Sequence, residues 1–150
     1  MTTKKILLAA DRSPRADAVA AIVADTARGA HATVRLLHVA PQPSAIHDAD
    51  GRVVVYADQE TESLRSEGLD YLRTLELHFD EMPVESVVRF GDPVAEILAE
   101  AEAFGADLIV VGTAGRSGIG RVLLGSVAER VFAKATASVI LVRPTVAGAT

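Results

Sequence analysis

Short runs of apolar residues along this chain are separated by longer segments in which apolar positions recur every three or four residues. A continuous apolar run is typical of a strand buried on both faces of a parallel sheet, and the longer period is typical of a helix with one buried face. The pattern predicts strands at Lys5–Ala10, Thr33–Val39, Val84–Phe90, Asp107–Val111 and Ser138–Arg143. The last of these strands is expected to end before Pro144.

Helices are predicted between these strands. The first takes Ser13 as its N-cap and Pro14 as its first residue, and Gly29 fits its C-cap. The others are expected from about Asp58 to Leu77, after an N-cap at Asp92, and from about Ser126 to Lys134. Two readings remain open within residues 40–57, where Pro41 and Pro43 predict a loop and Val53–Tyr56 fits a short strand or part of a lid.

Strands separated by helices predict an α/β domain, in which a five-stranded parallel sheet is flanked by helices in a Rossmann-like nucleotide-binding arrangement. Right-handed crossovers favour the strand order 3-2-1-4-5, counted along the chain. The first and fourth strands then lie side by side, and ligands of such sheets bind beyond the carboxyl ends of the strands at this switch point. We expect the 150 residues to form one domain, residues 1–150.

The composition excludes several kinds of site and partner. The chain has no cysteine, which excludes thiol catalysis, iron–sulfur clusters and Cys-ligated zinc, and its four histidines lack metal-ligand spacing. A formal charge of −5 gives no general attraction to nucleic acid or to an anionic membrane, so neither is expected as a partner. The apolar run before Asp11 is too short for a signal peptide and no run could span a membrane, which favours a cytoplasmic protein.

Two segments should meet at the predicted switch point: Asp11 after the first strand, and the glycine-rich stretch Gly112–Arg121 after the fourth. Glycine lets the backbone turn tightly and brings its N–H groups close to phosphate oxygens. The N-terminus of the following helix adds unpaired N–H groups, and Arg116 and Arg121 carry guanidinium groups suited to charge-assisted hydrogen bonds. The loop is therefore predicted to hold a phosphate group.

The better-known motifs do not fit this stretch. A Walker A loop beginning at Gly115 would need Lys and Ser or Thr where Arg121 and Val122 stand. A dinucleotide fingerprint beginning at Gly118 would need glycine in place of Leu123. The Gly-x-Ser-x-Gly nucleophile elbow of a hydrolase does not occur, and no catalytic residue is assigned.

The spacing that the loop does have is Gly112-x2-Gly115-x9-Gly125-Ser126, and it resembles that of the ATP-binding, single-domain members of the universal stress protein family. The likeness covers essentially the whole chain outside residues 40–57. It extends, in the expected order, to Lys5–Asp11, Leu37-His38-Val39, Gly91-Asp92-Pro93, Asp107–Val111 and Leu124–Val131.

The resemblance implies an adenine nucleotide lying across the first and fourth strands, namely ATP, with Mg2+ as a candidate companion ion. Asp11, preceded by Ala10, would lie against the nucleoside, and the main chain of Val39 would meet adenine. Ribose and phosphates would lie along the loop and the start of the next helix, at Gly112, Thr113, Gly115, Arg116, Gly118, Gly125, Ser126 and Val127.

The resemblance also implies a homodimer formed through the last strand, Val139–Val142. In the proposed order this apolar strand lies at the edge of the sheet, where an uncovered strand is prone to aggregate unless it is paired. Its pairing with a second copy of the chain is the simplest solution.

Other interpretations of these residues stay open. Ser126 with Glu129 also forms a capping box, and Asp11 also fits the cap of a turn before Ser13. For function, the first hypothesis is a nucleotide-dependent regulatory module, for which the resemblance supplies the label of stress response. The alternatives are a weak ATPase or an enzyme that phosphorylates its own loop, a cyclic AMP-binding module, and a ligand-free dimeric interaction module.

Overall fold

The computed structural model describes residues 4–13, 15–43, 46–112 and 126–143, and its centre is a five-stranded parallel sheet. The order β5-β2-β1-β6-β7 is the predicted order 3-2-1-4-5, which is thereby confirmed. Each predicted strand is present to within one residue at either end. The bounds are Lys5–Ala9 for β1, Thr33–Ala40 for β2, Val84–Phe90 for β5, Leu108–Gly112 for β6 and Ser138–Val142 for β7.

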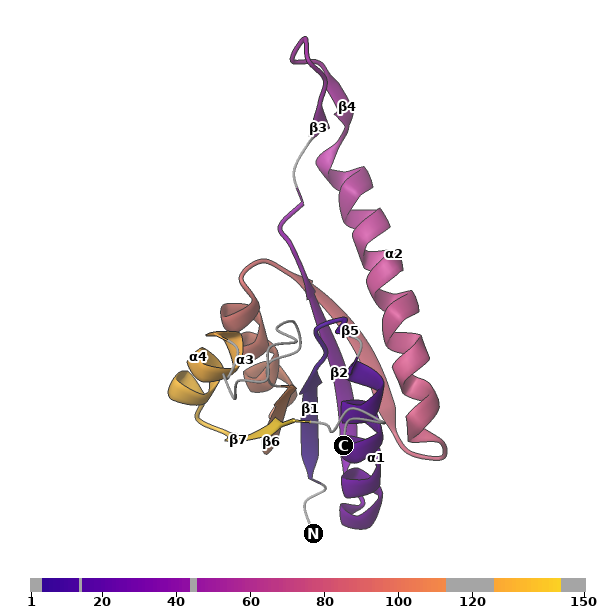
Figure 1. Cartoon of the computed structure of the whole chain (residues 1–150), viewed down its shortest axis with the longest axis vertical. Coiled ribbons are helices and arrows are strands. Elements are labelled where there is room, and N and C mark those ends of the chain that lie inside the picture. The colour runs from indigo at the N-terminus through magenta and orange to yellow at the C-terminus, as the bar shows by residue number, and fades with distance from the viewer. Residues whose placement is uncertain (1–3, 14, 44–45, 113–125, 144–150) are drawn as a thin grey trace, which may run out of the picture.

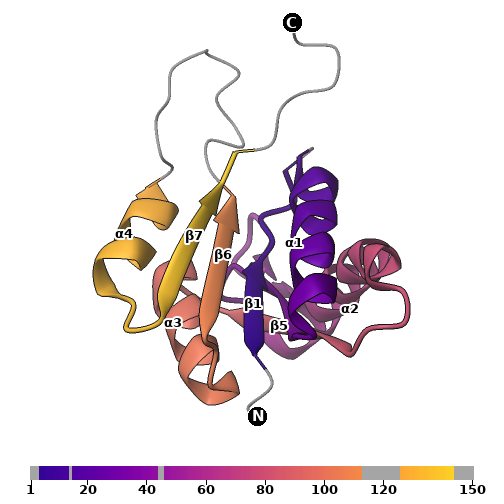
Figure 2. The same ribbon diagram turned by 90° about the horizontal axis from the view of Figure 1, so that it is seen from below.

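Helices cover both faces of the sheet (Figure 2). α1 (Ala16–Ala30) and α2 (Ala57–Glu76), with the short 3-10 helix η1 (Leu77–Phe79), lie on one face, and α3 (Pro93–Phe104) and α4 (Ser126–Lys134) lie on the other. The core accordingly has two halves. Successive side chains of a strand point to opposite faces, so Ile6 and Leu8 pack under α1 while Leu7 packs under α3 and α4.

The helix after β5 begins as the sequence predicts. The Asp92 carboxylate accepts a hydrogen bond from the Ala95 N–H at 2.9 Å, and Pro93 occupies the first turn. The last turn of α3 ends at Gly105, whose φ of 72° is a left-handed conformation that glycine adopts without a steric cost.

The predicted ends of α1 are wrong. The helix begins at Ala16 after Arg15, which makes no side-chain cap, and Ser13 contributes only its carbonyl, to the Ala16 N–H at 3.1 Å. Pro14 lies outside the described residues. The C-terminal end comes at His31, with a φ of 54°, because continuing past Gly29 brings Ala32 into the core, where it is buried.

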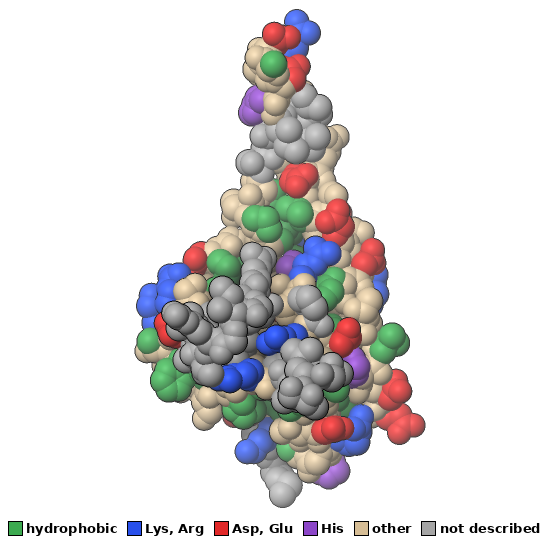
Figure 3. Space-filling model, in the orientation of Figure 1, with side chains coloured by type: hydrophobic (Ala, Val, Ile, Leu, Met, Phe, Trp, Pro, Cys, Tyr) green, Lys and Arg blue, Asp and Glu red, His purple; other side chains and the backbone are tan. Residues whose placement is uncertain are grey.

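A two-stranded antiparallel hairpin, β3 (Ile46–His47) and β4 (Val53–Val55), projects beyond the sheet at the N-terminal end of α2 (Figure 1). Its turn is closed by the Asp48 carboxylate, which accepts the N–H groups of Asp50 and Arg52, each at 2.9 Å. Acidic and basic side chains lie at its tip (Figure 3). Of the two readings for Val53–Tyr56, the short strand is present.

Candidate functional site

The first and fourth strands of the prediction, β1 and β6, lie side by side, with Leu7 opposite Ile109 and Ala9 opposite Val111. The chain leaves β1 toward α1 on one face of the sheet, and α4, which follows β6 in sequence, lies on the other face (Figure 2). This is the switch point of a doubly wound sheet, beyond which ligands bind in such folds. The predicted site residues Ala10, Asp11 and Gly112 stand at this carboxyl edge.

Asp11 begins the turn that leads from β1 to α1. Its Oδ1 accepts the N–H of Ser13 at 2.9 Å, so the prediction that it caps a turn is confirmed. The side chain is exposed. Among the described residues its second carboxylate oxygen makes no hydrogen bond, although a carboxylate oxygen is a strong acceptor.

The residue after Asp11 is held by a helix that lies far away in the sequence. Arg12 has a φ of 61°, in the left-handed region that residues with a Cβ atom rarely adopt. Its N–H donates to the Tyr71 hydroxyl oxygen of α2 at 3.1 Å, and its guanidinium carbon lies 5.5 Å from the centre of the Tyr71 ring. A cation over an aromatic face at this distance is attracted by the ring.

His38 packs against the same tyrosine, with ring centres 5.8 Å apart and an edge-to-face angle of 76°. Its Nδ1 is buried and has no hydrogen-bond partner in the part of the chain that the structure describes. Burial lowers the pKa of His38, a backbone hydrogen bond to Ala10 opposes the change, and the charge of Arg12 adds to it. Burial likewise raises the pKa of Tyr71 to about 12, so its hydroxyl is neutral at physiological pH.

The main chain of Val39 faces the side of β2 on which β1 lies, at a level of the sheet where β1 has already ended. The Ala10 N–H donates to the Leu37 carbonyl at 2.8 Å, so the main-chain groups of Leu37 face β1, and those of Val39 face the same way. β1 ends at Ala9 and the chain then turns at Asp11. Neither the N–H nor the C=O of Val39 forms a hydrogen bond within the described ranges, so one donor and one acceptor stand at this edge.

Gly112 ends β6 without any local need for glycine. A Cβ atom built there would meet only the Val19 Cγ2, at 3.7 Å, which is ordinary contact. Its φ is not among the positive values found in the described chain. Among the described residues, neither packing nor backbone conformation accounts for this glycine.

The rest of the predicted loop contacts fall in two groups. Thr113, Gly115, Arg116, Gly118 and Gly125 lie outside the described residues. Ser126 is the exposed first residue of α4 and Val127 is half-buried beside it, at the same end of the sheet as the carboxyl ends of β6 and β7 (Figure 2). The first-turn N–H groups of α4 therefore lie toward this edge, as the sequence predicted.

Two functional candidates at this edge, Arg12 and Tyr71, are not evident from the sequence. They are 59 residues apart, and periodicity marks Tyr71 only as one more partly apolar position of a helix. A charged residue between Asp11 and Ser13 carries no signal either, because left-handed backbone is expected of glycine or asparagine.

Within residues 4–13, 15–43, 46–112 and 126–143 no three His, Cys, Asp or Glu side chains are grouped as metal ligands. In the same ranges no helix is both long and apolar enough to cross a membrane.

Comparison with known proteins decides the family. The chain matches the model of the universal stress protein family over residues 2–143. The chain belongs to the universal stress protein family. It is similar to the universal stress protein YxiE of Bacillus subtilis, with 30% identity over 146 residues that cover 93% of this chain and 98% of that protein. It is also 40% identical over 85 residues to the universal stress protein MJ0531 of Methanocaldococcus jannaschii, covering 55% of this chain and 50% of that protein.

Solved structures of universal stress proteins share the fold. Protein MJ0577 of Methanocaldococcus jannaschii superposes with a TM-score of 0.77 at 24% identity, covering 97% of this chain and 99% of that one. A universal stress protein in complex with cAMP gives a TM-score of 0.62, covering 97% of this chain and 100% of that one. One from Archaeoglobus fulgidus in complex with dAMP gives 0.56, covering 93% and 97%; both are 20% identical to this chain.

Proposed function

We propose that this universal stress protein is a single-domain regulatory module that binds ATP at the carboxyl edge of β1, β2 and β6. The observation that carries the proposal is that the main-chain groups of Val39 and one carboxylate oxygen of Asp11, both at this edge, form no hydrogen bond among the described residues. Adenine offers a donor and an acceptor along one edge, which a strand backbone can pair. Ribose hydroxyls are donors that a carboxylate accepts.

The described residues fit an adenine nucleotide. Gly112 leaves room where phosphate would pass, and the first turn of α4, beginning at Ser126, offers N–H groups to an anion. The two relatives solved with cAMP and dAMP have adenine nucleotides as ligands, which supports the same ligand class here. Thr113, Gly115, Arg116, Gly118 and Gly125 would complete the phosphate contacts. Mg2+ would bind mainly through the phosphates, as it does in many nucleotide sites.

A binding role is favoured over catalysis. Among the described residues, Asp11 is the carboxylate at the switch point, and one of its oxygens is already taken by the Ser13 N–H. The role of Asp11 is therefore to orient the nucleoside. A nucleotide held there would order the β6–α4 connection and so change the surface that the protein presents to partners.

A titration of the intact chain with ATP, ADP, AMP and cyclic AMP, with and without Mg2+, tests the ligand. We expect a thermal shift and calorimetric binding with ATP, larger with Mg2+. A shift with cyclic AMP alone would keep the site and change the ligand, whereas product formed from ATP at useful turnover would favour the enzyme hypothesis. Absence of binding by all four would overturn the proposal in favour of a ligand-free module.

Substituting Gly115→Val tests the phosphate loop. A side chain where the phosphate oxygens approach is expected to weaken ATP binding by about a hundredfold or more, the loss of roughly two charge-assisted hydrogen bonds. Isothermal titration calorimetry measures the change. Gly29→Val is the matched control, since a Cβ atom at Gly29 meets nothing within 4 Å and Gly29 lies far in the sequence from the predicted phosphate loop. Unchanged affinity in Gly115→Val, at normal stability, would contradict the assignment.

We propose further that two copies associate through β7. This strand is the edge of the sheet beyond β6, and its residue Ile140 is 43% exposed. On the neighbouring helix α4, Phe132 is 62% exposed. Pairing of β7 in one copy with β7 in another would continue the sheet across the two copies and cover these side chains. Light scattering is expected to give a dimer for the wild type and a monomer for Ile140→Lys, with Ile22→Lys on α1 as an equally exposed control. A dimer that survives Ile140→Lys would contradict this interface.

A further inference from the structure

We propose that Tyr71 of α2 is a positioning residue for the nucleotide site, because its hydroxyl holds Arg12 in the left-handed conformation that directs the Asp11 carboxylate. The inference rests on the proposed function, since Asp11 is assigned to the nucleoside there. It adds a residue from α2, a helix to which the proposed function assigns no ligand contact.

The first step is the conformation of Arg12. Its φ of 61° places the Cβ atom close to its own backbone, which disfavours this conformation for a residue such as arginine. In this conformation the Arg12 N–H donates a hydrogen bond to Tyr71 Oη at 3.1 Å. The cost of the conformation and the gain from one hydrogen bond are similar in size. The bond therefore decides how much of the population has the turn in place.

The second step is the rigidity of Tyr71 itself. α2 approaches the sheet closely at Gly68, where a Cβ atom would stand 2.8 Å from Val88 Cγ2 and 3.0 Å from His38 Cδ2. One turn further along α2, the Tyr71 ring meets His38 edge to face. The hydroxyl is thus carried by a ring with little freedom to move, which is what a positioning contact requires.

The third step is the effect on Asp11. The Ser13 N–H that binds Asp11 Oδ1 at 2.9 Å lies on the other side of Arg12, so the backbone of Arg12 sets the geometry of this contact. The Arg12 guanidinium lies over the Tyr71 ring, and no ion pair joins it to Asp11 among the described residues. Tyr71 therefore keeps the carboxylate oriented and also keeps it free of its neighbouring cation.

This arrangement makes a quantitative prediction for affinity. A ligand that binds one conformer of a protein has an apparent Kd equal to its intrinsic Kd divided by the fraction of that conformer. Tyr71→Phe keeps the ring and the stacked guanidinium but removes the hydroxyl. We expect it to raise the Kd for ATP about fivefold, the size of one neutral hydrogen bond.

Rescue by glycine distinguishes positioning from general stability. Glycine adopts a φ near +60° without strain, so in an Arg12→Gly background the hydroxyl is no longer needed. We expect Tyr71→Phe to change the Kd less than about twofold in that background, because the coupling between the two positions is removed. Calorimetric titration of the wild type, both single variants and the double variant measures this coupling, with thermal unfolding of all four recorded in parallel.

The outcomes separate the two proposals. If the wild type binds ATP and Tyr71→Phe binds it equally well, or loses the same affinity in the Arg12→Gly background as in the wild-type background, the positioning role is overturned while the proposed function stands. If the wild type binds no adenine nucleotide, the proposed function and this inference both fall. Amide exchange gives a further readout, since the Arg12 N–H is expected to exchange faster in Tyr71→Phe, and an unchanged rate would also overturn the inference.

Discussion

His38 is a half-buried side chain whose protonation the fold opposes. Burial removes water from its ring and Arg12 adds a nearby positive charge, while the hydrogen bond with the backbone of Ala10 acts in the opposite direction. Tyr71, which packs on the same ring, stays neutral because its pKa is about 12. The pKa of His38 in the folded protein therefore lies below 6.5, its ordinary value.

This lowered pKa predicts a loss of stability on the acid side. As the pH falls through 6.5, the unfolded chain takes up a proton on His38 before the folded chain does, so the free energy of unfolding decreases. The decrease continues, at up to about 1.4 kcal/mol per pH unit, until His38 in the folded protein is itself protonated. Above pH 6.5 both states are neutral at this position and it contributes no pH dependence.

An NMR titration of the His38 ring measures the folded pKa directly, and urea unfolding at several pH values measures its effect. His38→Gln is expected to flatten the acid-side dependence by the contribution of one proton. A folded pKa at or above 6.5 would show that burial does not dominate the protonation of His38.

The residues at the carboxyl edge differ in how far sequence alone predicts them. Asp11 and Gly112 follow from the ends of apolar runs, because strand ends in a parallel sheet meet at one edge, and Val39 follows from the resemblance to the family. Arg12 and Tyr71 cannot be predicted in either way. Their contact depends on how α2 is rotated and how closely it packs on the sheet, and a local sequence pattern does not determine these.

One glycine allows α2 to pack closely against the sheet. Gly68 lies in the interior of a 20-residue helix, where glycine costs about 1 kcal/mol relative to alanine. The added methyl group of alanine would stand 2.8 Å from Val88 Cγ2 and 3.0 Å from His38 Cδ2, so these side chains or the elements that carry them must shift. The close packing of α2 against β2 and β5 therefore depends on the absence of a side chain at Gly68.

Gly68→Ala is expected to destabilise the protein by about 1–2 kcal/mol, because the overpacking exceeds the gain in helix propensity. Gly29→Ala in α1 is the control, since its Cβ atom meets nothing within 4 Å, and it is expected to stabilise by about 0.5–1 kcal/mol. Chemical unfolding of both variants gives the comparison. Equal stabilisation by the two substitutions would show that α2 has room to move.

The helix ends illustrate the same division. The N-cap of α3 is predicted because Asp92-Pro93 is a local signal, and the side chain does accept the Ala95 N–H. Ser13 and Gly29 carry local signals of the same kind and are overruled. Asp11 takes the Ser13 N–H, and the burial of Ala32 extends α1 by one more residue before it ends.

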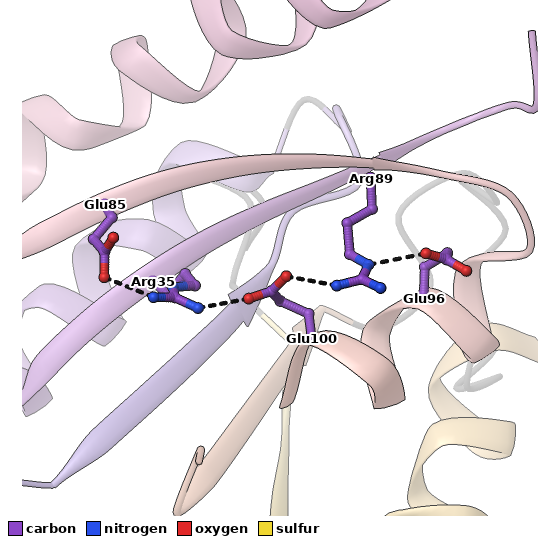
Figure 4. A network of polar contacts seen from close by, with 5 residues as sticks. All are labelled: Arg35, Glu85, Arg89, Glu96 and Glu100. Atoms are coloured by element: carbon purple, nitrogen blue, oxygen red, sulfur yellow. Dashed lines mark hydrogen bonds and ion pairs between the residues drawn. The ribbon is translucent and has the colours of Figure 1, made fainter. Parts of the chain in front are cut away.

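One polar network joins the sheet to the helix layer on the face of α3 (Figure 4). Glu100 of α3 is buried and accepts from Arg35 of β2 at 2.6 Å and from Arg89 of β5 at 2.9 Å. Glu85 and Glu96 bind the outer sides of the two arginines. Burial lowers the pKa of Arg35, but its hydrogen bonds to Glu85 and Glu100 outweigh this and the pKa is raised overall.

Glu100 is therefore the member on which the network depends. Glu100→Gln would leave two guanidinium groups beside a neutral amide in a site with little water, and is expected to cost about 2–3 kcal/mol in the free energy of unfolding. Glu85→Gln removes a carboxylate whose side chain is 55% exposed, and about 0–1 kcal/mol is expected. Urea unfolding compares the two; equal effects would mean that Glu100 is solvated well enough to be replaced.

The pattern of apolar positions carried enough information for the layers, the strand order and the edge of the sheet at which its switch point lies. Each of these follows from short-range periodicity together with the handedness of crossovers, and both are properties of the backbone. The Arg12 turn, the burial of the His38 Nδ1 and the bridge made by Glu100 could not be derived in this way. Each depends on side chains from separate elements, as in the Arg12–Tyr71 contact across 59 residues and the Arg35–Glu100 contact across 65. Such contacts exist only once packing has set the distance between those elements.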